Sequence, residues 1–275
     1  MTNHIAFQGA LGAYSHDACQ TARPDMTPLP CATFEDVIEA VRCGAADLAM
    51  LPVENSTYGR VADIHRFLPE SGLHIIAESF TRVRIAKMAL PGVKLEDIKT
   101  ARAHLVLLPQ ARGFLNKHNI RASSAADSAG AAAELANSSD RSTAVLASAL
   151  AADTYNLEIL AQDIEDHHHN TTRFLIMARE ADLKPRGDTM MTTFVFQVRN
   201  IPAALYKAMG GFATNGVNMT KLESYMVGGS FTATQFYADI QGHPDDDNVK
   251  LALDELGYFS SMVKILGVYP ADKTR

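Results

Sequence analysis

The pattern of hydrophobic and polar positions changes part way along the chain. Through roughly the first 180 residues, short β-rich apolar runs alternate with helical patterns, which predicts an α/β layer architecture. Thr33 and Asp36 form an N-terminal capping pattern for a helix that Gly44 ends. Strands are expected at residues 5–7, 48–51, 73–78 and 83–90, a further helix starts near residue 16, and alanine-rich helices are expected at residues 128–136 and 142–152.

Beyond residue 182 the pattern of hydrophobic and polar positions predicts a compact β-α-β-β-α-β unit. Residues 183–192 combine charge with Pro185 and Gly187, and they are the expected linker. The expected elements are a strand at 193–198, a helix opened by Pro202, a strand at 217–225, a hairpin at Gly228-Gly229, a strand at 231–240, a helix at 247–256 stopped by Gly257, and a strand at 262–268. This order is the ferredoxin-like split βαβ arrangement.

Composition narrows the class of protein. The 275 residues carry a net charge of -6 and are 47% hydrophobic, as in a soluble globular protein without the basic footprint of a nucleic-acid binder. Three cysteines without a Cys-x-x-Cys pair suggest neither a disulfide framework nor a zinc site. The start of the chain lacks a signal-peptide pattern, and no apolar run reaches about eighteen residues, so we expect a cytoplasmic protein without a membrane partner.

The most informative local pattern is the polar run that ends in Thr171, Thr172 and Arg173 and leads into the apolar residues 174–177. Arginine makes a two-pronged match to a carboxylate, and a threonine hydroxyl can donate to an oxygen that leaves a substrate. A small acidic substrate is therefore one hypothesis. An ordinary polar turn with a surface cation is the other.

Two further stretches bear on that hypothesis. The turn from Gly9 to Ser15 precedes an expected helix, whose N-terminus could receive an anion or simply end a structural turn. Glu54, Asn55 and Ser56 follow a buried strand, at the edge where open α/β sheets bind ligands. Glu54 could have a raised pKa there or could merely accept hydrogen bonds as a helix cap.

A histidine triplet at residues 167–169 invites a metal assignment. Adjacent residues of an extended segment point to opposite sides, and no cysteine or carboxylate stands at ligand spacing. We therefore interpret it as a polar loop and expect no metal site.

Several sequence blocks resemble the prephenate dehydratase family in order and separation. They are Gly9-x-x-Gly12-x-Tyr14-Ser15, Pro52-Val53-Glu54-Asn55-Ser56-x-x-Gly59-x-Val61 and Asn170-x-Thr172-Arg173-Phe174, with intervening blocks at residues 103–112, 127–132, 142–144 and 155–157. Residues 204–205 and 215–224 resemble the ACT regulatory domain attached to that enzyme. The resemblance covers nearly the whole chain.

The resemblance implies a two-lobed catalytic domain like that of periplasmic binding proteins, followed by a ferredoxin-like (βαββαβ) ACT domain. The expected catalytic domain spans residues 1–182, with lobe one at about 1–77 plus 160–182 and lobe two at about 78–159. The linker is 183–192 and the ACT domain 193–275. The substrate is expected in the cleft between the lobes.

The family's reaction removes carboxylate and hydroxyl from prephenate and gives phenylpyruvate, carbon dioxide and water. The resemblance makes Thr172 the candidate hydrogen-bond donor to the leaving oxygen, and Glu54 a candidate for relaying a proton to it. The expected substrate-binding residues are Ser15, Asn55, Ser56, Asn170, Arg173 and Phe174. No cofactor is expected, because the ring itself accepts the electrons.

The resemblance also implies feedback by L-phenylalanine, in a chain that pairs as a homodimer or homotetramer. The expected effector site comprises Ala203, Ala204, Leu205, Asn218, Glu223 and Ser224. Ala203, Tyr225 and Met226 depart from the family's regulatory motifs, which puts the affinity in question. Two alternatives stay open: an arogenate dehydratase, and a non-catalytic amino-acid-sensing protein.

Overall fold

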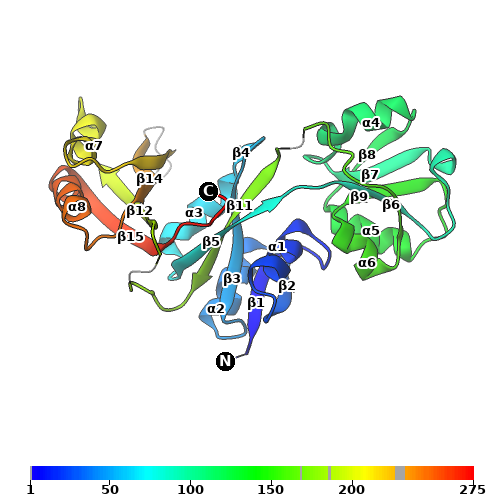
Figure 1. Ribbon diagram of the computed structural model, residues 1–275, viewed down its shortest axis with the longest axis horizontal. Coiled ribbons are helices and arrows are strands. Elements are labelled where there is room, and N and C mark those ends of the chain that lie inside the picture. Colours follow the sequence, from blue (N-terminus) through cyan, green and yellow to red (C-terminus); the bar gives the residue numbers. More distant parts are fainter. Residues whose placement is uncertain (1, 168, 185–186, 227–232) are drawn as a thin grey trace. The chain divides into compact units, whose positions relative to one another are not determined.

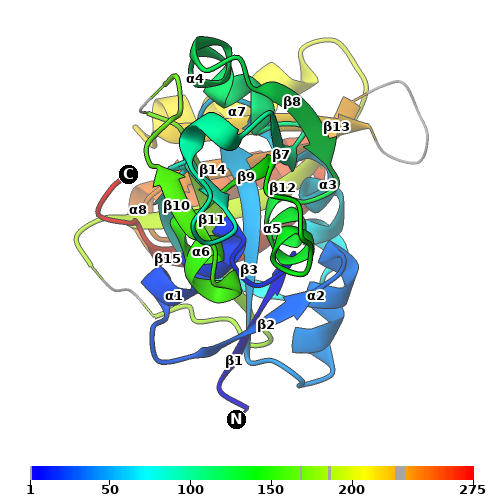
Figure 2. The ribbon, with the colours of Figure 1, turned by 90° about the vertical axis from the view of Figure 1, so that its right-hand side faces the viewer.

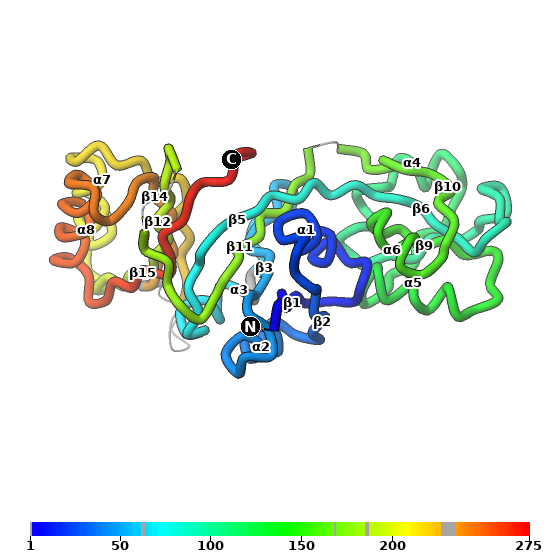
Figure 3. The backbone as a smooth tube through the Cα atoms, turned by 60° about the horizontal axis from the view of Figure 1, so that its bottom comes forward, coloured from blue at the N-terminus to red at the C-terminus, as the bar shows by residue number. Residues whose placement is uncertain are grey.

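The computed structural model describes residues 2–167, 169–184, 187–226 and 233–275 (Figure 1). The chain forms two compact units: Met1–Ile64 with Ser79–Phe174, and His65–Glu78 with Leu175–Arg275. Strands β5 (His74–Arg82) and β11 (Thr171–Ala178) each contribute residues to both units, and they are neighbours in the sheet (Figure 3). The predicted linker lies within the second unit.

Lobe one of the first unit is a parallel sheet with helices. Strand β1 (His4–Gln8) pairs in parallel with β2 (Thr27–Cys31) and with β3 (Leu48–Asn55), and the short β4 (Gly59–Arg60) pairs with β3. Helix α1 (Tyr14–Ala22) follows β1, and α3 (Ala62–Phe67) follows β4. Helix α2 (Phe34–Arg42) confirms the predicted capping box of Thr33 and Asp36 and buries the predicted apolar face.

Lobe two is a five-stranded sheet in the order β10-β6-β9-β7-β8. Helix α4 packs on one face, and α5 and α6 pack on the other (Figures 1 and 2). The elements are β6 (Ala86–Ala89), η2 (Leu95–Asp97), β7 (Thr100–His104), η3 (Leu108–Ala111), α4 (Arg112–Lys117), β8 (Arg121–Ala125), α5 (Ser128–Ala136), β9 (Thr143–Ala147), α6 (Ala149–Tyr155) and β10 (Glu158–Ala161). Strands β7, β8 and β9 are parallel, so their carboxyl ends share one edge.

One predicted element of this region was wrong, and another was predicted too long. Residues 142–152, expected to be one helix, form a strand followed by a short helix. Every residue of β9 is buried, and β9 has a neighbouring strand on each side, β6 and β7. Alanine favours helices, but a fully buried central strand also accepts small side chains, and here packing decides. The strand expected at 83–90 is shorter, and β5 extends further than expected, to Arg82.

The C-terminal part of the second unit has the predicted β-α-β-β-α-β order. Its elements are β12 (Met190–Val198), α7 (Ala204–Thr214), β13 (Met219–Met226), β14 (Ala233–Gln241), α8 (Asp247–Phe259) and β15 (Ser260–Pro270), with strand order β13-β14-β12-β15. One buried cluster joins the two helices to the sheet. Helix α8 continues through Gly257, which is therefore not the predicted stop, and the hairpin predicted at Gly228-Gly229 lies outside the described residues.

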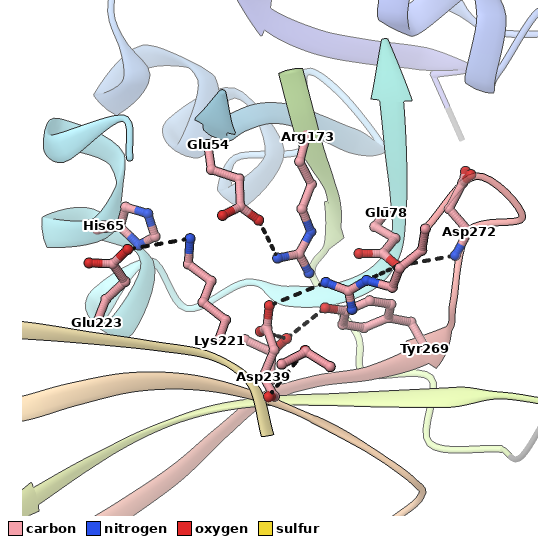
Figure 4. A network of polar contacts seen from close by, with 12 residues as sticks. Glu54, His65, Glu78, Arg173, Lys221, Glu223, Asp239, Tyr269 and Asp272 are labelled. Carbon is pink, nitrogen blue, oxygen red and sulfur yellow. Dashed lines mark hydrogen bonds and ion pairs between the residues drawn. The ribbon is translucent and has the colours of Figure 1, made fainter. Parts of the chain in front are cut away.

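Residues 65–78 belong to this unit although they come early in the chain. They include η1 (Leu68–Glu70), where the Pro69 carbonyl oxygen accepts from Lys264 Nζ at 2.6 Å. The fully buried Glu78 carboxylate accepts from the Asp272 backbone N–H at 3.1 Å and lies 3.4 Å from the Arg275 guanidinium (Figure 4). Asp272 and Arg275 follow β15, so residues after the last strand bind Glu78 of β5.

Among the helices that the structure describes, none has the length and apolar character needed to cross a membrane.

Candidate active site

A cavity of about 480 Å³ lies in the first unit and is lined by residues of both lobes. It opens where parallel strands end: β1 and β3 of lobe one, and β7, β8 and β9 of lobe two. That edge is where ligands bind in parallel α/β sheets. Four of the residues predicted to form a site line this cavity: Ser15, Asn55, Asn170 and Thr172.

The Thr172 hydroxyl belongs to a hydrogen-bond network whose polarity is fixed by the backbone. Asn55 Oδ1 accepts from the N–H groups of Thr57 and Tyr58 at 2.9 and 3.0 Å, so the other end of this amide must be the donor. That amide nitrogen donates to Thr172 Oγ1 at 3.0 Å and to Asn170 Oδ1 at 2.6 Å. The Thr172 oxygen thus accepts, and its own proton is left for an acceptor in the cavity.

The network continues across the cavity to lobe two. Asn170 Nδ2 donates to Gln110 Oε1, and Gln110 Nε2 donates to the Val106 carbonyl oxygen at 2.9 Å. Every amide in this series has one possible orientation once Asn55 is fixed. Gln110 was not predicted as a site residue, and it ties the loop after β7 to the residues around Thr172.

The N-terminus of α1 faces the cavity without a side-chain cap. Its N-cap residue is Ala13, which offers no acceptor, so the first-turn N–H groups at Tyr14 and Ser15 lack a partner within the helix. The corresponding positions of α5 and α6 are capped by Asp127 and Ser148, which also line the cavity. An anion in the cavity would therefore find free donors and a favourable helix dipole at α1.

The glycine turn before α1 is shaped by contact with lobe two. Gly12 has φ +84°, and a Cβ there would lie 2.7 Å from the Ala151 Cα atom of α6. Ser148 Oγ donates to the Gly12 carbonyl oxygen at 2.6 Å, and the Tyr155 hydroxyl donates to the Leu11 carbonyl oxygen at 2.8 Å. This close approach of backbone explains the glycine.

His16 holds the same turn from inside lobe one. Its Nδ1 accepts from the Gly12 N–H at 2.9 Å, and its ring stacks on Phe7. Burial lowers the pKa of His16, while Asp17 opposes that shift, so the neutral ring that this hydrogen bond needs is favoured.

Glu54 and Arg173 are paired with each other (Figure 4). Arg173 Nη1 lies 2.9 Å from Glu54 Oε1, and Arg173 is only 1% exposed. Side chains alternate along strands, so Arg173 faces away from its neighbour Thr172, and Glu54 faces away from Asn55. Neither Glu54 nor Arg173 is among the residues lining the cavity.

The remaining two predicted site residues also lie outside the cavity wall. Ser56 Oγ donates to the His169 carbonyl oxygen at 3.0 Å and accepts from the Thr171 N–H at 2.9 Å, which joins the end of β3 to the start of β11. Phe174 is buried in the core. His168, the middle of the histidine triplet, lies outside the described residues. No group of three or more His, Cys, Asp and Glu side chains among the described residues is placed to hold a metal ion.

The residues predicted for an effector site lie in the second unit at two ends of one strand pair. Ala203 is the N-cap of α7 with φ 61°, and Ala204 and Leu205 begin that helix. Glu223 and Ser224 lie near the end of β13, at the level where β12 leads towards α7, whereas Asn218 precedes β13 and donates to Gln241. At about 3.3 Å per residue, Asn218 and Glu223 are about 16 Å apart along the strand.

Sequence reasoning missed the residues that lobe two contributes to the cavity. They are His104, Gln110, Asp127, Ser128 and Ser148. Each lies at or just after the end of β7, β8 or β9, or in the loop after β7. The rule that ligands bind at strand ends would have found most of them, had these strands been predicted.

Fold and site together define a two-lobed α/β protein with a cavity where the strands of both lobes end. The chain belongs to the prephenate dehydratase family, whose family model matches residues 5–182. Enzymes of this family act in aromatic amino acid biosynthesis, and membership makes the chain a dehydratase.

Relatives span nearly the whole chain. A bifunctional N-acyl-homoserine lactone acylase/prephenate dehydratase of Komagataeibacter europaeus is 51% identical over 98% of this chain and 97% of its own. Arogenate dehydratase/prephenate dehydratase 1 of Arabidopsis thaliana is 36% identical over 98% of this chain and 73% of its own.

Two solved structures are similar to the whole fold. One is GqqA, a quorum-quenching acylase, with TM-score 0.94, 50% identity and 99% of both chains covered. The other is prephenate dehydratase of Arthrobacter aurescens in complex with L-Phe, with TM-score 0.88, 31% identity, and 97% of this chain and 89% of that chain covered.

Proposed function

We propose that the chain catalyses the decarboxylative dehydration of prephenate to phenylpyruvate. The observation that carries the proposal is the fixed polarity of the Asn55 amide, which makes Thr172 Oγ1 an acceptor and leaves its proton available to a group in the cavity. The oxygen that leaves the ring gains negative charge in the transition state, and a preorganised donor there stabilises it.

The substrate is a dianion, and the cavity offers a place for one carboxylate. We assign that carboxylate to the uncapped first turn of α1, with the Ser15 hydroxyl beside it. Binding there replaces the carboxylate's water with fixed N–H donors. The leaving hydroxyl then points to Thr172, and aromatisation drives the loss of carbon dioxide.

Glu54 and Arg173 take a supporting role in this proposal. Their ion pair joins β3 to the neighbouring β11 on the face opposite to Asn55 and Thr172. A proton relay through Glu54 would need a path from the opposite face of β3, because Glu54 does not line the cavity.

The test compares Thr172→Ala with Thr172→Ser, using prephenate and arogenate side by side and following phenylpyruvate and phenylalanine. We expect turnover to fall about two to four decades in the alanine variant and to be largely kept in the serine variant. Near-normal turnover in a folded Thr172→Ala protein would sink the assignment. Faster turnover of arogenate by the wild type would make the chain an arogenate dehydratase.

A second candidate activity is hydrolysis of N-acyl-homoserine lactones. The identity of 51% to a bifunctional relative favours it, and Val61, Val83 and Leu107 give the cavity apolar wall that could take an acyl chain. Ser128 Oγ, however, accepts from the backbone N–H of His104, and this bond does not activate a nucleophile. Release of homoserine lactone by the purified protein would establish the activity.

We further propose that L-phenylalanine regulates the enzyme at an ACT domain formed by residues 193–275. The relative from Arthrobacter aurescens, whose structure is a complex with L-Phe, supports this. Asn218 lies at the opposite end of β13 from Glu223 and Ser224, so a site using all of these residues needs a second copy of the chain. Titration calorimetry with phenylalanine, together with sedimentation, tests the effector and the dimer; no heat at millimolar ligand would reject the effector.

A further inference from the structure

The proposed reaction consumes one proton, because the ring oxygen leaves as water. Thr172 cannot be the origin of that proton, since an aliphatic hydroxyl is far too weak an acid to give it up at neutral pH. The structure must therefore offer another group on the cavity wall that carries a transferable proton.

The described residues that line the cavity include five ionisable side chains: Tyr14, Tyr58, Arg60, His104 and Asp127. They come from α1, the turn between β3 and β4, β4, the end of β7 and the residue before α5. Most of these groups are unsuited to donating a proton.

Tyr14 keeps its proton. Burial, with a further contribution from Glu165, raises its pKa, and its hydroxyl donates to the Arg84 carbonyl oxygen at 3.0 Å. Both side-chain oxygens of Asp127 are occupied as acceptors from the N–H groups of Ala129 and Gly130 at the N-terminus of α5. Arginine and tyrosine side chains are in general poor proton donors near neutral pH.

His104 remains, and histidine is the side chain that most often serves as a general acid. Its backbone N–H is held by Ser128 Oγ at 2.9 Å, and its Nδ1 faces the Val106 N–H at 3.4 Å. In the neutral ring this long contact makes Nδ1 the acceptor and leaves the proton on Nε2, whereas the protonated ring carries a proton on both nitrogens and gives the contact up. The Val106 carbonyl oxygen accepts from Gln110, so the loop that positions His104 is the one joined to Asn170 and Asn55.

We infer that His104 is the general acid that protonates the departing hydroxyl, and this inference rests on the proposed prephenate dehydratase activity. The ring C–O bond breaks with its electron pair on oxygen, which takes the Nε2 proton and leaves as water. The bond from the ring to its carboxylate breaks, its electron pair enters the ring, and carbon dioxide leaves. His104 starts this step as the imidazolium, ends as the neutral ring and regains a proton from solvent.

The experiment measures kcat and kcat/KM for prephenate against pH in the wild type, His104→Gln and Tyr58→Phe. Glutamine can still accept from Val106 with its side-chain oxygen, which preserves the loop. In the wild type we expect activity to decline on the alkaline side as the imidazolium is lost. In His104→Gln we expect kcat to fall about a hundredfold or more and this alkaline decline to disappear. Tyr58→Phe is expected to keep the decline.

Two further variants guard against a structural explanation. His104→Ala should recover part of its kcat when imidazole is added, which a merely misfolded loop would not do. His118→Gln replaces a histidine of the same lobe whose ring contacts Phe114 and does not line the cavity, and it should behave as wild type.

Near-normal kcat in His104→Gln, or a lower kcat with the alkaline decline intact, overturns the role of His104. Loss of the decline in Tyr58→Phe assigns the proton to Tyr58 instead and also overturns it. If the wild type turns over neither prephenate nor arogenate, the proposed function itself fails, which is a separate result.

Discussion

Replacing Gly12 by alanine tests the closeness of the contact between the two lobes. The added Cβ would lie 2.7 Å from the Ala151 Cα atom and 3.0 Å from its Cβ atom, and both belong to the body of α6 and cannot rotate away. The backbone of residue 12 is also in the left-handed region, with φ +84°, where alanine costs about 1 kcal/mol more than glycine.

The expected loss in free energy of unfolding is the sum of the steric effect and the backbone effect. Overpacking of this kind costs about 1–3 kcal/mol beyond the backbone term when the neighbour cannot yield. If α6 instead moves away, the hydrogen bond from Ser148 to the Gly12 carbonyl oxygen is lost and the cavity wall opens. We then expect KM for prephenate to rise about tenfold, because free donors at α1 are displaced from the substrate.

The matched control is Gly92→Ala. Gly92 has φ +73°, but a Cβ there meets only the end of the Arg141 side chain at 3.6 Å, so this variant bears the backbone cost alone. Urea unfolding gives the free energy of each variant, and steady-state kinetics gives KM. Equal destabilisation of both variants with unchanged KM would refute the steric reasoning.

Three other substitutions probe separate features. Burial lowers the pKa of His16 in the folded state, so below about pH 6.5 the unfolded chain binds a proton that the folded chain does not. The free energy of unfolding of the wild type is therefore full above that pH and falls below it. In His16→Gln this loss of stability on acidification should be absent. Denaturant midpoints at several pH values measure this, and a parallel decline in the variant would contradict it. Glu54→Gln removes the charge facing buried Arg173 and should cost about 1–2 kcal/mol in urea unfolding while leaving the pH profile of kcat intact; a hundredfold loss of kcat would revive the proton relay. Ala203→Gly should raise the free energy of unfolding by about 0.5–1 kcal/mol, since φ 61° strains alanine; a lower melting temperature would argue against stored strain.

Local signals predicted much of the fold. Helix α2 was predicted from its capping box, Thr33 and Asp36, and from the apolar face that follows. Both features depend on residues within one or two helical turns, so the local sequence pattern was enough to predict the helix. Strands β7 and β8 were missed because they are short and partly polar, with serine and arginine where strands usually carry branched residues. Strand β9 was mistaken for a helix because only its position inside the sheet distinguishes the two.

The candidate site was predictable on one side of the cavity only. Ser15, Asn55 and Thr172 stand in recognisable blocks, and the structure places all three on the wall. Adjacent residues of such a block point to opposite faces of a strand, so a motif alone could not show that Glu54 turns away while Asn55 turns inward. The contribution of lobe two depends on contacts more than a hundred residues apart, such as Ser148 with Gly12, which no local pattern encodes.

The membership of residues 65–78 in the second unit limits how this protein can be divided or recombined. A cut at residues 183–192 looks natural in the sequence, yet it would separate Pro69, Ile75 and Glu78 from Lys264, Gly267 and Asp272, with which they make contact. The C-terminal part is therefore not expected to fold as an independent domain without residues 65–78. Exchange of this module between homologous genes would succeed only when the short early segment travels with it, so the two stretches should be inherited, and should diverge, as a matched pair.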